Sequence, residues 1–329
     1  MSGGSLSPIR RHAQTLPPDQ FSLILIGTVI VASLLPVTGT ALDVAGTISN
    51  AAIFVLFFFH GLRLSHASVW AGMKQWRLQL TVLAFGFGVM PLAGLSLATL
   101  LPAMLSPQLW LGVLFLCALP STVQSAIAYS SLAKGNVAAS LIAAALSNLL
   151  GVILTPLIVT LLLSVSGAAV GLGAVVKIAT LLLLPFILGQ VAQKWLAPWA
   201  ERHKVWVGRM DKVTIVLAVY TAFSAAMAEA IWSRVSIGQL AIVTVVLILL
   251  LTFALGATWV IGGALGWPRE DRITLLFSGS QKTLATGAPM ARILFPGPDA
   301  GLIIIPLMIY HQMQLIISAW IATHLNRAT

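Results

Sequence analysis

Charged residues are scarce in this chain. Of its 329 residues only 8% are Asp, Glu, Lys or Arg, whereas 59% are hydrophobic, and the mean hydropathy is +1.00. Soluble domains carry about 25% charged residues, so this composition excludes a protein whose main solvent is water. A membrane span needs about 20 apolar residues, and the chain holds enough of them for about ten to twelve helices.

Cysteine and deeply placed carboxylates are also nearly absent. The single cysteine, Cys117, lies inside an apolar run, which excludes an internal disulfide, a thiolate metal cluster and a two-cysteine redox motif. Asp43, Glu229 and Asp299 stand at the ends of apolar runs. Because no carboxylate pair, metal cluster or nucleophile beside a base appears, we expect no enzyme, no metal and no cofactor.

Regular alternation of apolar and polar residues is missing as well, for example in residues 181–188 and 242–251. This excludes the strands of a membrane barrel, and helices are the other structure that satisfies the backbone in lipid. We therefore predict an all-α integral membrane protein with ten transmembrane helices. The expected spans are 20–36, 43–62, 78–101, 109–132, 137–164, 172–193, 211–232, 237–264, 273–295 and 300–325.

The formal net charge of +10 comes from Lys and Arg in short segments between apolar runs. We interpret it as topology-setting charge under the positive-inside rule, not as a nucleic-acid surface. Residues 1–19 are expected to be a disordered cytoplasmic tail, and both termini are then cytoplasmic in a plasma membrane or bacterial inner membrane. Residues 35–39 lack a small-residue cleavage pattern, so we expect the first span to be retained.

Ten spans divide into two groups of five, which cross the membrane in opposite directions because five is odd. We assign the first five-helix repeat to residues 20–193 and a cytoplasmic linker to 194–210. The remainder of the second repeat, which begins at about residue 172, is assigned to 211–329. This is the inverted repeat common among secondary transporters.

Polar stretches interrupt two spans at corresponding places in the two halves. Span four contains residues 120–125 (PSTVQS) and span nine contains residues 278–283 (SGSQKT). Helix breaks at membrane depth are tolerated only where protein or a watery cavity satisfies the freed backbone groups. Paired breaks point to a transporter's substrate site, although structural kinks with back-bonded Ser and Thr give the same pattern.

Lys282 lies ten positions from both Arg272 and Arg292. At about 1.5 Å per residue it is about 15 Å from each, near the middle of the bilayer, where a charge is costly and indicates function. Four roles fit this position. Lys282 would bind an anionic substrate, exchange the coupling proton, act as a fixed cation in an empty ion site, or be a structural lysine held by carbonyls of the broken helices.

Polar residues of spans five and ten complete the candidate site. His311 is suited either to a proton relay or to a hydrogen bond between helices. The candidate substrate-binding residues are Lys282, Gln281, Ser280, Ser278, Thr283, Ser121, Thr122, Gln124, Ser125, Asn148, His311 and Gln314.

Several segments resemble the bile acid:sodium symporter family, and more closely its SBF-like branch within solute carrier family ten. They are residues 57–62 (FFFHGL), 131–138 (SLAKGNVA), 154–157 (LTPL) and 278–285 (SGSQKTLA). The resemblance extends over nearly all of residues 20–325. It implies a panel domain of spans 1, 2, 6 and 7 and a core domain of spans 3, 4, 5, 8, 9 and 10, with broken spans four and nine crossing in the core.

The chain departs from this family where the resemblance implies sodium ligands. Sodium-coupled members carry Ser-Asn in span four, Ser and Thr in span five, and E-x-G-x-Q-N in span nine. Five of these positions differ here, namely Ala126, Ile127, Ala144, Phe277 and Lys282. Apart from the motif glycine, Gly279, only Ser140 and Gln281 are kept, and these two are the candidate ion ligands. The departures argue against sodium symport.

We therefore expect a secondary active transporter of small organic anions, such as bile-acid-like compounds or other carboxylates and sulfates, in which the core rocks against the panel. Its coupling is expected to use protons or a lysine-substituted cation site. The alternative is a membrane regulator of calcium homeostasis with little transport of its own. The expected partners are a small organic anion and membrane lipids, without nucleic acid, and no pattern indicates an oligomeric state.

Overall fold

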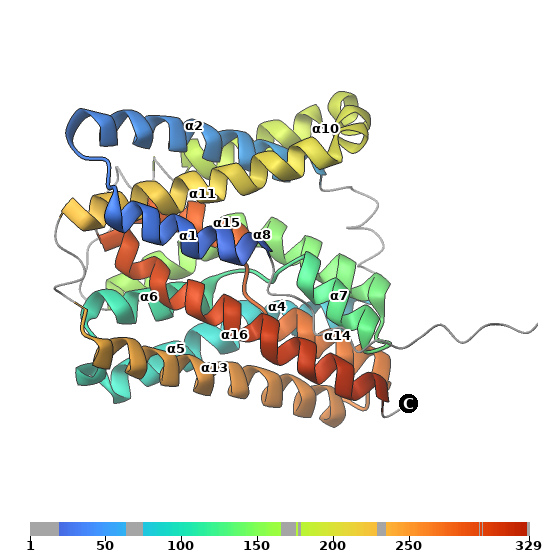
Figure 1. The fold of residues 1–329 in the computed structure, drawn as a ribbon. Helices are drawn as coiled ribbons and strands as arrows, with labels where there is room; N and C mark the ends of the chain where they lie inside the picture. The colour runs from blue at the N-terminus through green and yellow to red at the C-terminus, as the bar shows by residue number, and fades with distance from the viewer. Residues whose placement is uncertain are drawn as a thin grey trace, which may run out of the picture.

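The computed structural model describes residues 20–63, 75–165, 176, 179–228, 235–295, 297 and 299–327, and the regular structure within them is helical (Figure 1). The tail expected in residues 1–19 lies outside this part of the chain. The helices in chain order are α1 (Gln20–Leu34), α2 (Gly39–Arg63), α4 (Trp76–Ala84), the π-helix η1 (Phe85–Val89), α5 (Met90–Leu100), the 3-10 turn η2 (Pro102–Met104), α6 (Pro107–Ala118), α7 (Gln124–Leu132), α8 (Val137–Val165), the π-helix η3 (Ala179–Leu183), α10 (Leu184–Arg202), α11 (Lys204–Ala228), α13 (Ile237–Ala264), α14 (Arg269–Ser280), α15 (Leu284–Leu294) and α16 (Asp299–Arg327).

Seven helical segments of the described chain are long and apolar enough to cross a membrane, and each overlaps one predicted span. They are Gly39–Arg63, Trp76–Leu100, Val137–Leu162, Thr180–Arg202, Lys204–Ala228, Ile237–Ala264 and Asp299–Arg327. Predicted span one is the shorter helix α1, with 15 residues. Predicted spans four and nine are each divided into two short helices. The chain is thus a helical multi-pass membrane protein.

Helix α13 illustrates how local sequence sets a span. It begins where the Ser236 hydroxyl accepts a hydrogen bond from the amide of Gln239 at 3.1 Å, which caps the first turn. Beyond its last residues, Gly266 adopts a positive φ of 68°, a conformation that favours glycine. The apolar run between these two signals continues without a charged residue, and the helix matches the predicted range 237–264.

Residues 194–210, which we expected to form a linker, are helical on both sides of His203. Helix α10 continues to Arg202 and α11 begins at Lys204. The charges of this stretch alternate with exposed tryptophans such as Trp195 and Trp206. Such aromatic side chains favour the membrane–water interface, so we interpret these helix ends as interfacial, and the cytoplasmic linker between the two repeats stays a prediction.

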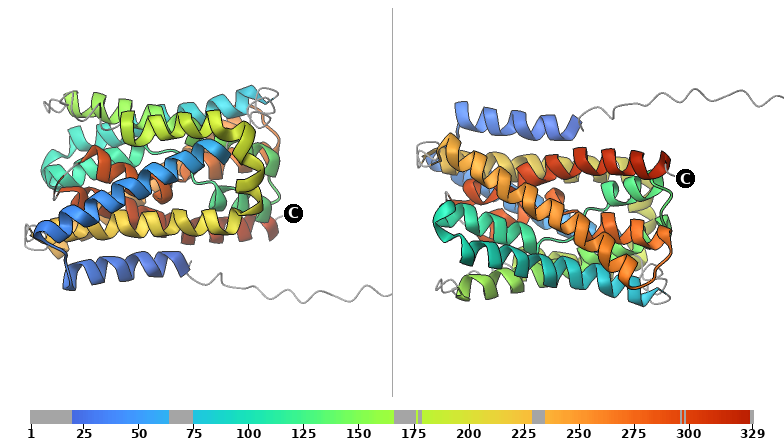
Figure 2. Two further views of the ribbon diagram at one scale, coloured as in Figure 1. Left: turned by 90° about the horizontal axis from the view of Figure 1, so that it is seen from above. Right: turned by 90° about the horizontal axis from the view of Figure 1, so that it is seen from below.

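The helices pack into two groups, which lie one above the other in Figure 1. In the first helix group, α2 packs against α10 and α11, and α1 packs against α11. The second helix group contains α4 to α8 and α13 to α16, in which α6 packs against α16 and α14 packs against α7, α8 and α13. The groups meet mainly where α11 contacts α15 and α16. Helix α1 lies at the edge of the molecule in both views of Figure 2.

Helices α2 and α10 approach each other through two glycines. A Cβ atom on Gly61 would lie 2.1 Å from the carbonyl oxygen of Phe186, and one on Gly189 would lie 2.1 Å from that of Phe58. Small residues at a helix crossing let the two backbones come together, which is how membrane helices gain packing contacts. The first helix group is therefore held together by direct backbone contact at this crossing.

Two helices are interrupted in mid-course, as the sequence predicted. Between α6 and α7 the backbone of Leu119 is extended, with φ −72° and ψ 151°. Extended geometry is favoured before a proline, because the ring of Pro120 disfavours the helical region for the residue before it. Between α14 and α15, Gln281 and Thr283 are extended as well. The amide of Thr283 donates to the carbonyl of Pro120 at 3.0 Å, so the two breaks lie side by side.

Candidate functional site

The side chain of Lys282 is buried beneath the two breaks, with 1% of its surface exposed. Its Nζ donates to the carbonyl oxygens of Gly86, Cys117 and Leu119, each at 2.8 Å. Cys117 lies in the last turn of α6, Leu119 directly follows that helix, and Gly86 lies in η1. An ammonium group has three N–H donors, and all three are used here.

The backbone of Lys282 is held separately by the side-chain amide of Gln314 on α16. The Gln314 Oε1 accepts from the amide of Lys282 at 2.8 Å, and its Nε2 donates to the Lys282 carbonyl at 2.9 Å. Both side chains are almost fully buried. One glutamine therefore satisfies the two backbone groups that the break of span nine frees from their helix.

A corresponding arrangement holds the break of span four. The Ser147 hydroxyl on α8 accepts from the amide of Ser121 at 2.9 Å, and the Asn148 Nδ2 donates to the Ser121 carbonyl at 2.8 Å. In both halves, the helix that follows the broken one supplies the groups that satisfy the break. Asn148 was among the residues predicted from the sequence, whereas Ser147 was not, although its position beside Asn148 was an available signal.

The ends of the half-helices are capped in the same manner. The Thr155 hydroxyl on α8 donates to the carbonyl of Ala118, where α6 ends, at 2.8 Å. The Tyr310 hydroxyl on α16 donates to the carbonyl of Ser280, where α14 ends, also at 2.8 Å. Neither Thr155 nor Tyr310 was among the candidates, because their acceptors are backbone carbonyls, which every residue has and which no sequence pattern identifies.

Gln281 joins the two breaks through its side chain. Its Oε1 accepts from the hydroxyls of Thr122 and Ser125, both at 2.5 Å. Its Nε2 is buried and has no hydrogen-bond partner among the described residues, and the same holds for the hydroxyls of Ser121 and Ser278. Buried polar groups are normally satisfied by protein, water or a ligand, so these atoms mark the polar interior of the site.

The positions that the family resemblance assigns to sodium ligands are filled largely by apolar side chains. Ala126, Ala144 and Phe277 are fully buried, and the Phe277 ring lies 5.7 Å from that of Tyr129. These side chains supply no oxygen ligand for a cation.

The two candidate ion ligands belong to separate hydrogen-bonded groups. Ser140 donates to the hydroxyl of Ser130 at 2.7 Å, at the packing of α8 against α7. Gln281 is bonded instead to Thr122 and Ser125 at the breaks. These hydrogen bonds therefore do not connect Ser140 with Gln281.

Burial divides the twelve candidate substrate-binding residues into two sets. Eight are buried, and the other four are Gln124, which is exposed, and the half-buried Ser125, Asn148 and His311. The His311 ring lies within 3.0 Å of Gln314, which holds Lys282. The buried hydroxyl of Ser280 is back-bonded to its own helix at Leu276, as in a structural kink.

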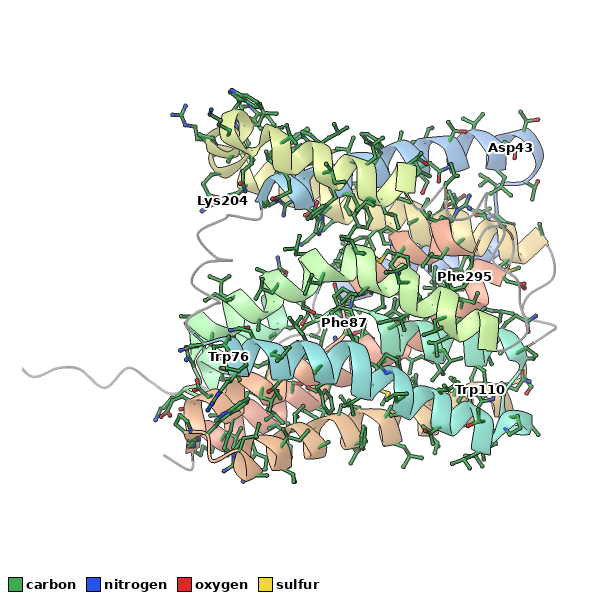
Figure 3. The ribbon with its side chains drawn as sticks, turned by 180° about the vertical axis from the view of Figure 1, so that it is seen from behind. Asp43, Trp76, Phe87, Trp110, Lys204 and Phe295 are labelled. Carbon is green, nitrogen blue, oxygen red and sulfur yellow. The ribbon has the colours of Figure 1, made fainter. Side chains whose placement is uncertain are left out.

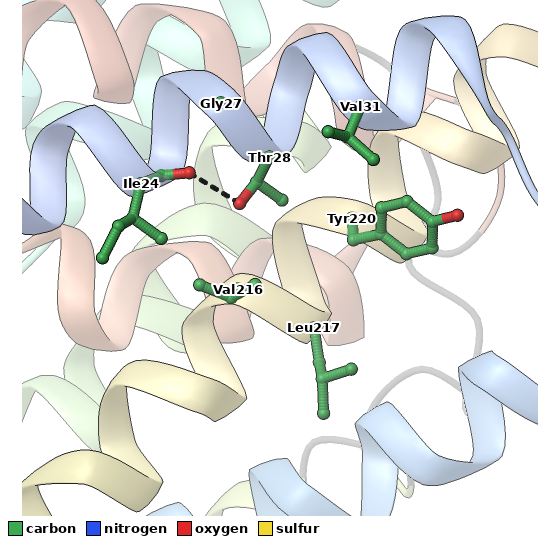
Figure 4. Close-up of a pocket in the computed structure, with 7 residues that line it drawn as sticks. All are labelled: Ile24, Gly27, Thr28, Val31, Val216, Leu217 and Tyr220. Carbon is green, nitrogen blue, oxygen red and sulfur yellow. Dashed lines mark hydrogen bonds between the residues drawn. The ribbon is translucent and has the colours of Figure 1, made fainter.

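A separate apolar cavity of about 340 Å³ lies between α1 and α11, away from the breaks (Figure 4). Its Thr28 hydroxyl donates to the Ile24 carbonyl at 2.7 Å. The Tyr220 hydroxyl donates to the Leu35 carbonyl at 2.9 Å. Because both hydroxyls already have acceptors and the other lining side chains are apolar, this cavity offers no arrangement suited to an anion.

Comparison with known proteins finds relatives over nearly the whole chain. Residues 19–327 match the profile of the SBF-like CPA transporter family. An uncharacterized protein of Pseudomonas aeruginosa is 47% identical over 94% of this chain and 93% of its own length. The "Putative symporter YfeH" of Escherichia coli K12 is 43% identical over 94% of both chains. Sodium/bile acid cotransporter 7 of Mus musculus is 25% identical over 90% of this chain and 88% of its own length.

The relatives that carry functional names are thus named as symporters and cotransporters, not as enzymes. The match extends through both helix groups and both breaks. The chain belongs to the SBF-like CPA transporter family.

Proposed function

We propose that this protein is a secondary active transporter of small organic anions, such as carboxylates or sulfates of the bile-acid type. The observation that carries this proposal is the meeting of two helix breaks above a buried ammonium group. Broken helices at membrane depth are the recurrent way in which transporters build a substrate site. The name of the mouse relative, which includes bile acid, agrees with an amphipathic organic anion.

The anion would be attracted by positive ends of helices. Helices α7 and α15 both begin at the breaks, and a helix N-terminus carries a partial positive charge from its free amides. The ammonium group of Lys282 adds a full positive charge near these helix ends. Because its three N–H groups donate to backbone carbonyls, it would attract the anion at a distance and would not bind it directly. Gln124, Ser125, Asn148 and His311 have exposed surface and would orient the anion.

Alternating access would come from motion between the two helix groups. We assign the first helix group to a panel domain and the second to a core domain, within an inverted repeat of ten spans. The hydrogen bonds from α8 to the backbone of Ser121 and from α16 to the backbone of Lys282 support the repeat, since each of these helices directly follows the broken span of its half. The contacts between the groups are made mainly by α11, so this helix would form the surface across which the two groups move.

The orientation proposed from the sequence places both termini in the cytoplasm of a plasma or bacterial inner membrane. In Figure 3, Lys204 and Trp76 lie at one end of the molecule, and Asp43, Trp110 and Phe295 lie at the other. Phe87, in η1, lies between these ends. Lys204 begins α11 within the basic stretch where α10 and α11 meet, so the positive-inside rule would make this end cytoplasmic.

Coupling to sodium is disfavoured because apolar side chains fill expected ligand positions. Two alternatives remain, a proton carried by a group such as His311 and a cation site that Lys282 fills. Half-burial of His311 keeps its ring within reach of water, whereas Lys282 has no such access.

Uptake into proteoliposomes tests the proposal. Purified protein would be reconstituted and offered radiolabelled taurocholate, a steroid sulfate and a short dicarboxylate, each under a proton gradient, a sodium gradient and no gradient. We expect gradient-driven accumulation of at least one anion above protein-free liposomes. Failure to accumulate or counterflow any of them would reject the transporter. Activity of the purified protein would in turn reject the calcium-regulator alternative.

A further inference from the structure

Three backbone carbonyls converge on one point beneath the breaks, and Lys282 Nζ occupies that point. The carbonyls belong to Gly86 of η1 and to Cys117 and Leu119 of α6, each 2.8 Å from the nitrogen. Convergent backbone carbonyls are how membrane proteins replace the hydration shell of a monovalent cation. The protein therefore builds a cation site from segments far apart in the chain.

Two of these carbonyls lose their helical N–H donors because α6 ends at the break. Cys117 and Leu119 stand where α6 ends, so no following helical turn continues to supply N–H groups to them. Ala118, between them, is capped separately by Thr155. A buried carbonyl without a donor is unfavourable, and the C-terminal end of a helix carries a partial negative charge. A positive group at this point satisfies both requirements.

The three carbonyls also indicate which protonation state of Lys282 fits the site. Three acceptors require three N–H donors, which only the ammonium form has, because a neutral amine would turn its lone pair toward one carbonyl. Among the described residues the ion pairs are Arg63 with Asp211 and Lys204 with Glu201, and neither involves Lys282. Carbonyl dipoles, not a carboxylate, therefore balance the charge.

We propose that Lys282 is a tethered cation, whose ammonium group permanently fills a three-carbonyl site so that the core binds no exchangeable cation. Its backbone is fixed by Gln314, and its three acceptors belong to the same helix group. The charge would thus move with the core as a rigid part. For its consequence on coupling, this inference rests on the proposed transport function, because an anion would then be carried without sodium.

The experiment removes the Lys282 ammonium group and measures whether a free cation then binds to the three carbonyls. Lys282→Ala removes the ammonium and leaves space beside the three carbonyls. Thermal unfolding of the purified full-length variant in detergent would be followed in choline chloride, sodium chloride, potassium chloride and methylammonium chloride at equal ionic strength. We expect at least one small cation at saturating concentration to raise the Tm by about 3 °C or more over choline.

Two variants serve as controls. Lys282→Met fills much of the same space with an uncharged chain, so its Tm should be the same in all four salts. Lys194→Ala removes an exposed lysine from α10 and should respond to the salts as wild type does. A Lys282→Ala variant whose Tm does not distinguish these cations from choline would overturn the tethered cation.

Wild type supplies a measurement that does not depend on the folding of any variant. Because its site is already filled, we expect its Tm to differ by less than about 1 °C between sodium and choline. A sodium-specific rise in wild type would show an exchangeable cation and overturn the inference. Since unfolding needs no substrate, cation rescue without anion uptake would reject the transporter alone, and uptake without rescue would reject the tethered cation alone.

Discussion

The side-chain amide of Gln314 pairs with both backbone groups of Lys282, accepting at 2.8 Å and donating at 2.9 Å. This pairing reproduces for one residue the two hydrogen bonds that a continuous helix would have supplied. It explains how a lysine stands in a broken span without its backbone being left unsatisfied in the membrane. The lysine side chain is then free to satisfy the end of α6.

Replacing Gln314 by leucine should destabilise the protein. The substitution keeps the volume but leaves the Lys282 amide and carbonyl buried without partners, at about 1–3 kcal/mol for each group. Unfolding of the purified protein in detergent measures the change, with Gln312→Leu on a half-buried neighbour as the control. A Gln314→Leu protein as stable as the control would show that the pairing contributes nothing.

Gly61→Ala should disrupt the α2–α10 crossing. The added Cβ would lie 2.1 Å from the Phe186 carbonyl, so the two backbones must separate, at a cost of about 1–3 kcal/mol. The matched control is Gly27→Ala on α1, where nothing lies within 4 Å of the new atom. Thermal unfolding compares the pair, and equal Tm values would contradict the close contact.

Gln124→Ala should weaken substrate binding while leaving the fold intact. The side chain is exposed beside the break, and a hydrogen bond to an anion contributes about 1.5–3 kcal/mol, which corresponds to a KM about tenfold or more higher. Uptake kinetics in proteoliposomes measure this effect once a transported anion is known. An unchanged KM would remove Gln124 from the proposed binding surface.

Arg292→Ala should loosen the contact between the helix groups. The Arg292 Nε donates to the Thr221 hydroxyl on α11 at 3.3 Å, and a Cβ on Gly46 of α2 would lie 3.0 Å from its guanidinium. A cysteine placed at Ser49, one turn beyond Gly46 and now buried, should react severalfold faster with an impermeant maleimide when Arg292 is alanine.

The native thiol leaves the background of that labelling low, because Cys117 is buried. Thr221→Val, which removes the accepting hydroxyl and keeps Arg292, should also increase labelling. Identical labelling rates with and without Arg292 would mean that this residue does not hold the groups together.

Sequence patterns alone determined the helical spans and the places where two of them break. Apolar runs, Pro120 and flanking charges act on their own stretch of chain, so their effect does not depend on distant partners. Local patterns placed the helix ends less well. Residues 194–210, which lie between the predicted spans 172–193 and 211–232, are helical on both sides of His203.

Tertiary structure decided what surrounds Lys282. Its three acceptors come from α6 and η1, more than 160 positions away in sequence, and they are backbone carbonyls that every residue type possesses. Likewise, Ser147 and Tyr310 gain their roles only when α8 and α16 pack beside the breaks. The sequence therefore predicted a lysine at the second helix break, and only the packing of distant helices brings three carbonyl oxygens to its Nζ. Backbone carbonyls are common to all residue types, so no sequence pattern identifies them as its partners.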